Sequence, residues 1–483
     1  MLLMKKTISL ILCLIMLLSM VACGNGAKND SATGATADPT EAANQFMVGY
    51  SKVNITPDYS IPLRGYGNPL NRMSSGFIDY IYATCAAITD ADGNTVVVFG
   101  IDLINAFEDI FLGYRQKIAE KLGIPVDNVH MSCSHMHAGC DMTVSHPSVE
   151  RYIQDCEAWF LKAAEEAMAD RKPATAMQYA STNTVGMNYI RRYLRSDGTP
   201  AGNKIEAFSD APITQYETEV DNQLQLLKFV REDGKDIIMA NFQMHPHRAS
   251  SSSSKDITAD IVGVFRTELE NKLDVNVLYF TGSSGNVTHG TKIEDEIVKD
   301  FREHGKALAK YAIDMEGKYT DVALGPVRTI STEYTGDMDH HRDHLVDEAK
   351  QVIQWMNSGK TLAECKHYMK EHWITSLDSA KAIVNKAAWP ETRTTGLWAF
   401  AVGDIAFAVV PFEMFSENGE FIKDNSPFTG TFVLTCANTH NTYLPSAQAF
   451  QNGGYEVDQS KFAPGTGEKV ADEYVKLLNA LKK

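Results

Sequence analysis

After its first residues, the 483-residue chain lacks the sequence features that mark membrane-spanning, disulfide-rich and nucleic-acid-binding proteins. After residue 22 it has no apolar run of about eighteen residues, the length that a membrane-spanning helix needs. Six cysteines follow Cys23, but their spacings are irregular and no Cys-x-x-Cys pair occurs. We therefore predict no disulfide framework, and expect most of these cysteines to be small buried apolar side chains.

Basic charge is also scarce. The formal net charge is −16, and residues 1–22, which contain Lys5 and Lys6 but no acid, leave a remainder near −18. This balance argues against a nucleic acid partner, because such proteins present a basic face. No internal repeat is visible, and 44% hydrophobic with 22% charged residues is typical of a globular protein.

The N-terminus has the pattern of a targeting segment. A basic start precedes an apolar run at 8–20, which ends at Ala22 and Cys23. This arrangement resembles a bacterial lipobox, so we expect a lipoprotein signal peptide at 1–22 and a lipid anchor on Cys23. The protein would then be extracytoplasmic and attached to the bacterial cell membrane. A plain signal peptide or an uncleaved anchor is the alternative. The composition of 23–45 predicts a disordered tether.

A continuous α/β pattern runs through 46–483, which we interpret as a single domain. The apolar run at 95–103 has strand length, helical spacing follows to a stop at Gly123, and a second strand begins at residue 129. A strand–helix–strand unit favours parallel strands. Further strands are predicted at 237–244, 275–280, 405–410 and 432–436, and further helices at 147–169, at 260–272 and in a helical insertion at 335–390.

Residues 134–139 read Ser-His-Met-His-Ala-Gly. Apolar and polar residues alternate from residue 129, which predicts a half-buried strand. His135 and His137 are in phase with the apolar residues, so both imidazoles are expected to extend the buried face. Buried imidazoles need partners. Backbone carbonyls and a metal ion are both possible at this point.

Polar side chains follow four of the predicted strands. His245 and His247 follow one strand, residues 282–286 the next, and Glu413 and Tyr443 the last two. In open α/β sheets, ligands bind beyond the carboxyl ends of the strands, so these groups are expected to converge. Two histidines and a carboxylate can make a zinc site with an open position for water. Zinc lowers the pKa of that water to roughly 7.

Serine catalysis is the competing chemistry at this edge. Residues 282–285 read Gly-Ser-Ser-Gly, which lacks the Gly-x-Ser-x-Gly spacing of a nucleophile elbow. A turn of small residues after a strand is more typical of tight packing or of an anion-binding nest. The sequence therefore favours metal chemistry over a serine triad.

Several of these motifs together resemble one known family. The opening segment 48–57, the His-x-His segment 134–139 and the segments 242–246, 258–263 and 411–413 resemble the neutral/alkaline (non-lysosomal) ceramidases. These are zinc-dependent amidases that cleave the N-acyl bond of ceramide. The resemblance implies their catalytic-domain fold, which is α/β with a mixed β-sheet core and surrounding helices. Known members also carry a C-terminal β-sandwich domain, which residues 456–483 are expected not to form.

The resemblance also implies a ligand set. In the family, Zn²⁺ is held by the first histidine of the His-x-His segment, a second histidine, a carboxylate and a tyrosine. The matching residues here are His135, His245, Glu413 and Tyr443. A second family tyrosine follows twelve positions after the zinc tyrosine, and Tyr455 has that spacing from Tyr443.

The same resemblance assigns four catalytic residues. His137 lines the site, and Tyr455 and Arg191 stabilise the oxyanion, as acyl transfer requires. Thr288 stands where the family has an active-site serine, and His289 replaces the proline that follows it. Threonine keeps the hydroxyl group but is bulkier and stiffer.

Together these expectations describe a lipid-anchored, zinc-dependent amidohydrolase. It would hydrolyse the N-acyl amide bond of ceramide or of a related N-acyl lipid, in contact with the membrane through its anchor. Two alternatives stay open. The first is a non-catalytic solute- or lipid-binding lipoprotein that uses the same cleft. The second is a zinc esterase or amidase with a non-sphingolipid substrate.

Overall fold

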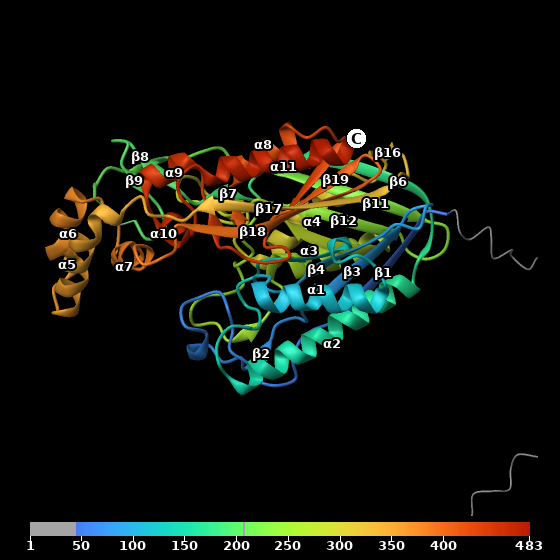
Figure 1. The fold of residues 1–483 in the computed structure, drawn as a ribbon, viewed down its shortest axis with the longest axis horizontal. Coiled ribbons are helices and arrows are strands. Elements are labelled where there is room, and N and C mark those ends of the chain that lie inside the picture. The colour runs from blue at the N-terminus through green and yellow to red at the C-terminus, as the bar shows by residue number, and fades with distance from the viewer. Residues whose placement is uncertain (1–44, 206–207) are drawn as a thin grey trace, which may run out of the picture. The chain divides into compact units, whose positions relative to one another are not determined.

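The computed structural model describes residues 45–205 and 208–483, and Figure 1 shows how their elements are arranged. The predicted leader and nearly all of the predicted tether fall on residues 1–44 and lie outside the described residues. Within the described residues, no helix combines the length and the apolar character needed to cross a membrane.

The secondary structure is a mixture of strands and helices. The helices are α1 Glu108–Leu122, α2 Pro147–Ala169, α3 Asp260–Leu273, α4 Phe301–Ile313, α5 Val346–Asn357, α6 Leu362–Glu371, α7 Leu377–Lys386, α8 Ser416–Asp424, α9 Ala447–Asn452, α10 Tyr455–Gln459 and α11 Thr466–Lys482. The strands are β1 Met47–Asn54, β2 Gly76–Phe77, β3 Tyr82–Thr89, β4 Thr95–Ile101, β5 Val129–Cys133, β6 Lys172–Asn183, β7 Tyr189–Ile190, β8 Tyr193–Arg195, β9 Pro200–Ala201, β10 Ile213–Tyr216, β11 Gln223–Arg231, β12 Ile237–Phe242, β13 Asp256–Ile257, β14 Asn276–Thr281, β15 Val287–Thr288, β16 Thr320–Val322, β17 Val327–Asp337, β18 Thr392–Val402, β19 Ile405–Val409, β20 Glu413–Met414, β21 Gly430–Leu434 and β22 Tyr443–Leu444.

Two mixed sheets form the core. In the described part of the chain, the larger sheet has nine strands in the order β14-β12-β11-β6-β1-β3-β4-β5, with β16 paired to β6. The smaller sheet has the order β17-β18-β19-β21. The pairs β4–β5, β12–β14 and β19–β21 are parallel, and the other pairs in these two sheets are antiparallel. The predicted fold class, α/β with a mixed sheet core, is confirmed.

The two sheets pack face to face. Phe400, Phe407 and Phe432 of the smaller sheet share one buried cluster with Val98 and Leu278 of the larger sheet. Helices cover the outer faces: α1 and α2 pack on one part of the larger sheet, α3 on another, and α11 on the smaller sheet. Figure 1 shows α11 on one side of the sheets and α1 and α2 on the other. Because both faces are covered, strands such as β4 are buried at every position and mostly apolar.

Several elements lie where the sequence predicts them. The helix predicted at 147–169 is α2, which has Pro147 at its first position and is capped by the side chain of His146. The helix before Gly123 is α1, and Gly123 closes it with a φ of 68°. In the segment 335–390, residues 335–337 belong to β17, and α5, α6 and α7 follow with a small hydrophobic core of their own. The cysteines in the described part of the chain are free and buried.

One stability prediction follows from the contact between β1 and α2. A Cβ placed on Gly49 would lie 2.0 Å from the carbonyl oxygen of Ala167. We expect Gly49→Ala to lower the free energy of unfolding by about 1–3 kcal/mol, the usual cost of overpacking. Gly113→Ala in α1 is the control, because its Cβ would have no atom within 4 Å. Urea denaturation should show that this second change is neutral or stabilising. Equal effects of the two changes would contradict the argument.

Candidate functional site

The candidate site lies beyond the carboxyl ends of strands from both sheets. β5 ends at Cys133 and β12 at Phe242, shortly before His135 and His245. β20 and β22, which follow β19 and β21, pair in parallel and place Glu413 directly opposite Tyr443. Two candidate ligands therefore follow strands of the larger sheet, and the other two follow strands of the smaller sheet.

The predicted strand geometry around His135 is wrong in two respects. β5 is buried at every position rather than half-buried, because it is covered on both faces. It also stops at Cys133, so His135 and His137 lie in the following loop and not on its buried face. His135 has a φ of 64°, a left-handed conformation that costs free energy in a non-glycine residue. This turn, and not strand alternation, directs its imidazole into the site.

The four predicted metal ligands converge. Oε2 of Glu413 lies 3.2 Å from Nε2 of His135 and 3.3 Å from Nε2 of His245. The hydroxyl of Tyr443 lies 3.5 Å from Nε2 of His245. His137 is close as well, since it offers a ring nitrogen within 4.8 Å of ring nitrogens of the other two histidines. The three histidines form a group that could bind a metal ion.

Burial makes this arrangement costly without a cation. His135, His245 and Glu413 are at most 5% exposed. Among the described residues, Nε2 of His135 and Oε2 of Glu413 have no hydrogen-bond partner, although they lie side by side. Unsatisfied buried polar atoms cost free energy, and a metal ion bound between these donors would remove that cost. The nitrogen, carboxylate and phenol donors suit Zn²⁺.

The charges in the site also favour a bound cation. Burial alone favours a neutral Glu413, but His135 holds the pKa of the carboxyl well below its usual range. Burial alone favours a neutral His135, but Glu413 raises the pKa of the imidazole well above its usual range. Burial, Arg191 and His135 lower the pKa of His245. The site thus holds a buried carboxylate, which requires either a proton on His135 or a bound cation to balance it.

Asn105 and the backbone fix the orientation of His135. Nδ1 of His135 lies 2.8 Å from the carbonyl oxygen of Ile104 and 3.1 Å from Oδ1 of Asn105. Both are acceptors, so Nδ1 carries a proton, and a metal ion that displaced the proton from Nε2 would meet the lone pair of that nitrogen. The sequence analysis did not identify Asn105.

We therefore expect Asn105→Ala to weaken metal binding by about 10- to 100-fold, as is usual when a group that orients a metal ligand is lost. Asn105→Asp keeps an acceptor at the same position and should retain most of the affinity. Competition with a chromophoric zinc chelator measures both variants. Equal affinities of the wild type and the alanine variant would show that Asn105 does not orient His135.

His440 is a second residue that the sequence analysis missed. Its Nε2 lies 3.1 Å from Oε1 of Glu413, the carboxylate oxygen that does not face His135. It is therefore placed to orient Glu413 while leaving Oε2 free. The available signal was its place between β21 and β22, three residues before Tyr443.

Arg191 reaches the site, whereas Arg192 does not. Nη2 of Arg191 donates to the Tyr443 hydroxyl at 3.1 Å and to the Gly285 carbonyl at 2.8 Å. The Arg192 guanidinium instead forms ion pairs with Glu217 and Glu456. Glu456 also lies beside Arg191, with 2.8 Å between its Oε1 and Nε of the arginine. Of the two neighbouring arginines, Arg191 is thus the one that contacts a candidate metal ligand.

A cavity of about 170 Å³ opens onto the cluster. His135, His137, Glu413, Tyr443 and Tyr455 all line it. The rings of Tyr443 and Tyr455 meet edge to face, with centroids 5.6 Å apart. Burial raises the pKa of Tyr455 to about 12, so its hydroxyl is protonated at neutral pH and can donate a hydrogen bond.

Thr288 is not among the residues that line this cavity. Its hydroxyl is 3.4 Å from Nε2 of His247, whose Nδ1 is 3.0 Å from Nε2 of His289. Burial and nearby positive charge lower the pKa of His247 to about 3, so this imidazole is neutral at pH 7. The rings of His247 and His137 are 5.2 Å apart. Thr288 is therefore connected to the cluster through His247.

Comparison with known proteins shows what the fold resembles. A crystal structure of neutral ceramidase from Pseudomonas aeruginosa superposes with a TM-score of 0.68 at 17% identity, covering 91% of this chain and 74% of that one. A structure of a ceramidase complexed with C2 superposes with a TM-score of 0.67 at 16% identity, covering 91% and 75%. No family model and no curated protein sequence matches the chain. The protein therefore has a fold similar to that of the neutral ceramidases.

Proposed function

We propose that the protein is a zinc-dependent amidohydrolase that cleaves the N-acyl amide bond of ceramide or of a related N-acyl lipid. One observation carries the proposal: His135, His245, Glu413 and Tyr443 meet at one buried point, in a fold similar to that of the neutral ceramidases. A protein that only captured a solute would have no need of four metal-type ligands around one point.

These four residues would hold the metal. When bound, zinc would supply Lewis acidity to the amide carbonyl and to an attacking water. Arg191 orients the Tyr443 phenol by donating to its oxygen. Tyr455 presents a protonated hydroxyl in the cavity, where it would donate to the oxygen that gains charge as the amide carbon becomes tetrahedral.

His137 is the group best placed to move a proton. It lines the cavity, and neither of its ring nitrogens has a hydrogen-bond partner within the described residues. Burial and the neighbouring histidines lower its pKa, so the imidazole is a neutral acceptor at pH 7. It would take a proton from the attacking water and pass it to the departing amine. We propose a supporting role for Thr288, through His247.

Exposed apolar side chains that follow a cavity-lining segment of the chain support a lipid substrate. Residues 65–67 line the cavity, and the segment that follows carries Leu70, Phe77, Ile78 and Tyr80, each at least 40% exposed. The Phe77 and Tyr80 rings stack with centroids 4.7 Å apart. Exposed apolar side chains that gather in this way mark interaction surfaces. This surface, with the anchor proposed at Cys23, fits a substrate taken from a membrane.

Zinc content and its removal test the proposal. Elemental analysis of the full-length protein in detergent should find about one zinc per chain, held by the four ligands. Removing the zinc with 1,10-phenanthroline should stop the release of fatty acid from a short-chain fluorescent ceramide, and added zinc should restore it. Failure to bind zinc after reconstitution would refute the metal site. If the protein bound zinc but hydrolysed only esters, the metal site would be supported and the proposed amide substrate would be refuted.

A further inference from the structure

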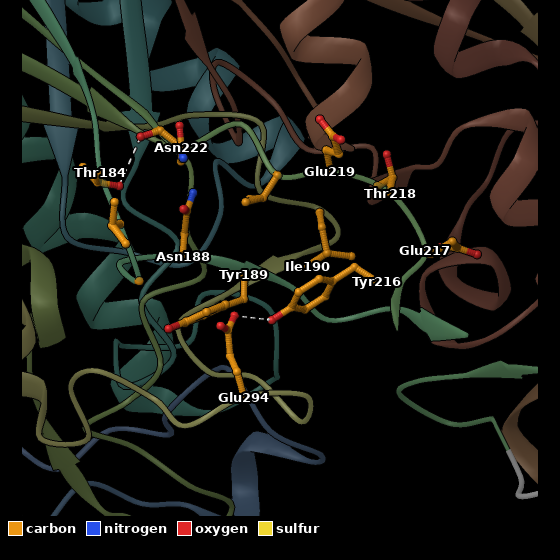
Figure 2. A pocket seen from close by; sticks show the side chains of 13 residues that line it. Thr184, Asn188, Tyr189, Ile190, Tyr216, Glu217, Thr218, Glu219, Asn222 and Glu294 are labelled. Carbon is orange, nitrogen blue, oxygen red and sulfur yellow. Dashed lines mark hydrogen bonds between the residues drawn. The ribbon is translucent and has the colours of Figure 1, made fainter. Parts of the chain in front are cut away.

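A second and larger cavity lies apart from the candidate metal site. Its volume is about 660 Å³, and it shares no lining residue with the cavity at the metal site. β7 separates the two regions, because Tyr189 and Ile190 line this cavity while the next residue, Arg191, contacts Tyr443. The lining residues are Thr184, Val185, Gly186, Asn188, Tyr189, Ile190, Tyr216, Glu217, Thr218, Glu219, Val220, Asn222 and Glu294. Figure 2 shows ten of them labelled.

The lining combines aromatic rings with carboxylates. Tyr189 and Tyr216 lie side by side with ring centroids 6.5 Å apart, and Figure 2 shows Glu294 next to both. The Tyr216 hydroxyl donates to Glu294 at 3.0 Å. The lining contains three glutamates and no lysine or arginine. Carboxylates beside tyrosine rings form an environment that attracts organic cations.

Asn188 adds an acceptor that lacks a donor. The residue is 3% exposed, and its Nδ2 donates to the carbonyl oxygens of Asp221 and Gln243 at 2.9 and 2.8 Å. Within the described residues, its Oδ1 has no hydrogen-bond partner. Figure 2 shows the end of this side chain extending among the cavity residues toward Asn222. A buried acceptor without a donor is unfavourable, so the site calls for a ligand that carries N–H or O–H groups.

The protein neutralises only some of the negative charge. Glu217 forms an ion pair with the Arg192 guanidinium, whose Nη1 lies 3.0 Å from Oε2 of Glu456. Among the described residues, the Glu294 carboxylate accepts a hydrogen bond only from the neutral Tyr216 hydroxyl. Glu219 has neither an ion-pair nor a hydrogen-bond partner in the described part of the chain. The remaining negative charge therefore favours a ligand that brings positive charge as well as donors.

We propose that this cavity binds the primary ammonium group of an organic amine. The ammonium donates to Oδ1 of Asn188 and its apolar part lies along the Tyr189 and Tyr216 rings, while the Glu219 and Glu294 carboxylates make the electrostatic potential of the cavity negative. Primary ammonium has three N–H donors and a positive charge, which matches both the free acceptor and the excess of carboxylates.

The proposed function provides a source for such a ligand, and this one point rests on it. Cleavage of an N-acyl amide by water yields a carboxylic acid and an amine, which is protonated at neutral pH. The cavity is also connected to the metal site, because Glu456 pairs both with Arg191, which contacts Tyr443, and with Arg192, which pairs with the lining residue Glu217. An amine product bound here would be linked to the candidate metal site through the ion pairs of Glu456.

Calorimetry with two matched probes tests the proposal without measuring activity. Benzylammonium chloride should bind the full-length protein at one saturable site, and benzyl alcohol, which has the same shape but no charge, should bind at least about tenfold more weakly. Raising the ionic strength should weaken the binding of benzylammonium alone. Equal binding of the two probes, or no binding of benzylammonium up to about 10 mM, would overturn the proposal.

Variants then locate the site. The exposed pair Glu219→Gln and Glu294→Gln removes two charges while keeping side-chain size, and together they should weaken benzylammonium binding about tenfold. Glu333→Gln with Glu391→Gln removes the same charge from exposed positions outside the cavity and should leave binding unchanged. His135→Ala should also retain binding, which separates this cavity from the metal site. Loss of binding only in His135→Ala would place the amine at the metal site and overturn the proposal.

Discussion

Replacing His245 with alanine should abolish both bound zinc and amide hydrolysis. His245 is fully buried, and its Nε2 lies within 3.5 Å of Glu413 and Tyr443. The loss of rate should be about a thousandfold or more, because a catalytic metal contributes several kcal/mol to the transition state. Elemental analysis and a fluorescent ceramide assay on the same preparation measure the two effects.

His367→Ala is the matched control for this experiment. His367 is an exposed residue on α6, outside the cavity, so its loss should change neither zinc content nor rate. Circular dichroism should show that both variants are folded. Full activity in a zinc-free His245→Ala variant would refute the proposed metal mechanism.

Tyr455→Phe should reduce kcat by about 10²- to 10³-fold, the range seen when one donor to an oxyanion is removed. The change deletes a single hydroxyl and keeps the ring that meets Tyr443 edge to face. Zinc content should stay at the wild-type level, since Tyr455 is not among the four ligands. KM should change little, because the interaction that is lost forms mainly in the transition state.

A tyrosine away from the site is the control for this second change. Tyr368→Phe on α6 removes a hydroxyl that lies outside the cavity and should leave kcat unaltered. If Tyr455→Phe kept wild-type kcat, Tyr455 would be a packing residue only. If zinc were lost with it, Tyr455 would act through the metal site rather than on the substrate.

The sequence predicted single elements better than their assembly. α2 was predicted over its full length because Pro147 marks its start and its apolar residues recur at helical spacing. β4 and β19 were predicted because a strand covered on both faces is a continuous apolar run. Such a run does not reveal what covers it. For that reason the face-to-face packing of the two sheets, in which the His130 ring of the larger sheet stacks on the Phe400 ring of the smaller one, could not be predicted from the pattern.

The residues of the candidate site also divide into those that the sequence identifies and those that it does not. Residues that follow an apolar run, such as His245 and Glu413, can be found because strand ends gather at one edge of a sheet. Asn105 and His440 could not be found in this way. They contact His135 and Glu413 rather than standing among the four candidate ligands, and only the folded backbone brings them within hydrogen-bonding distance. His135 was expected on a strand, and its left-handed turn has no signature in the pattern of apolar residues.

The division of the four candidate ligands between the two sheets has a consequence for how the molecule forms. His135 and His245 follow strands of the larger sheet, whereas Glu413 and Tyr443 pair with each other beyond the smaller sheet. Each sheet alone presents only two of the four proposed ligands, so the complete set forms only where the two sheets meet. Tight binding of zinc would therefore indicate that the two sheets have packed against each other. The metal would then join the two sheets at one end, so that separating them also requires its release.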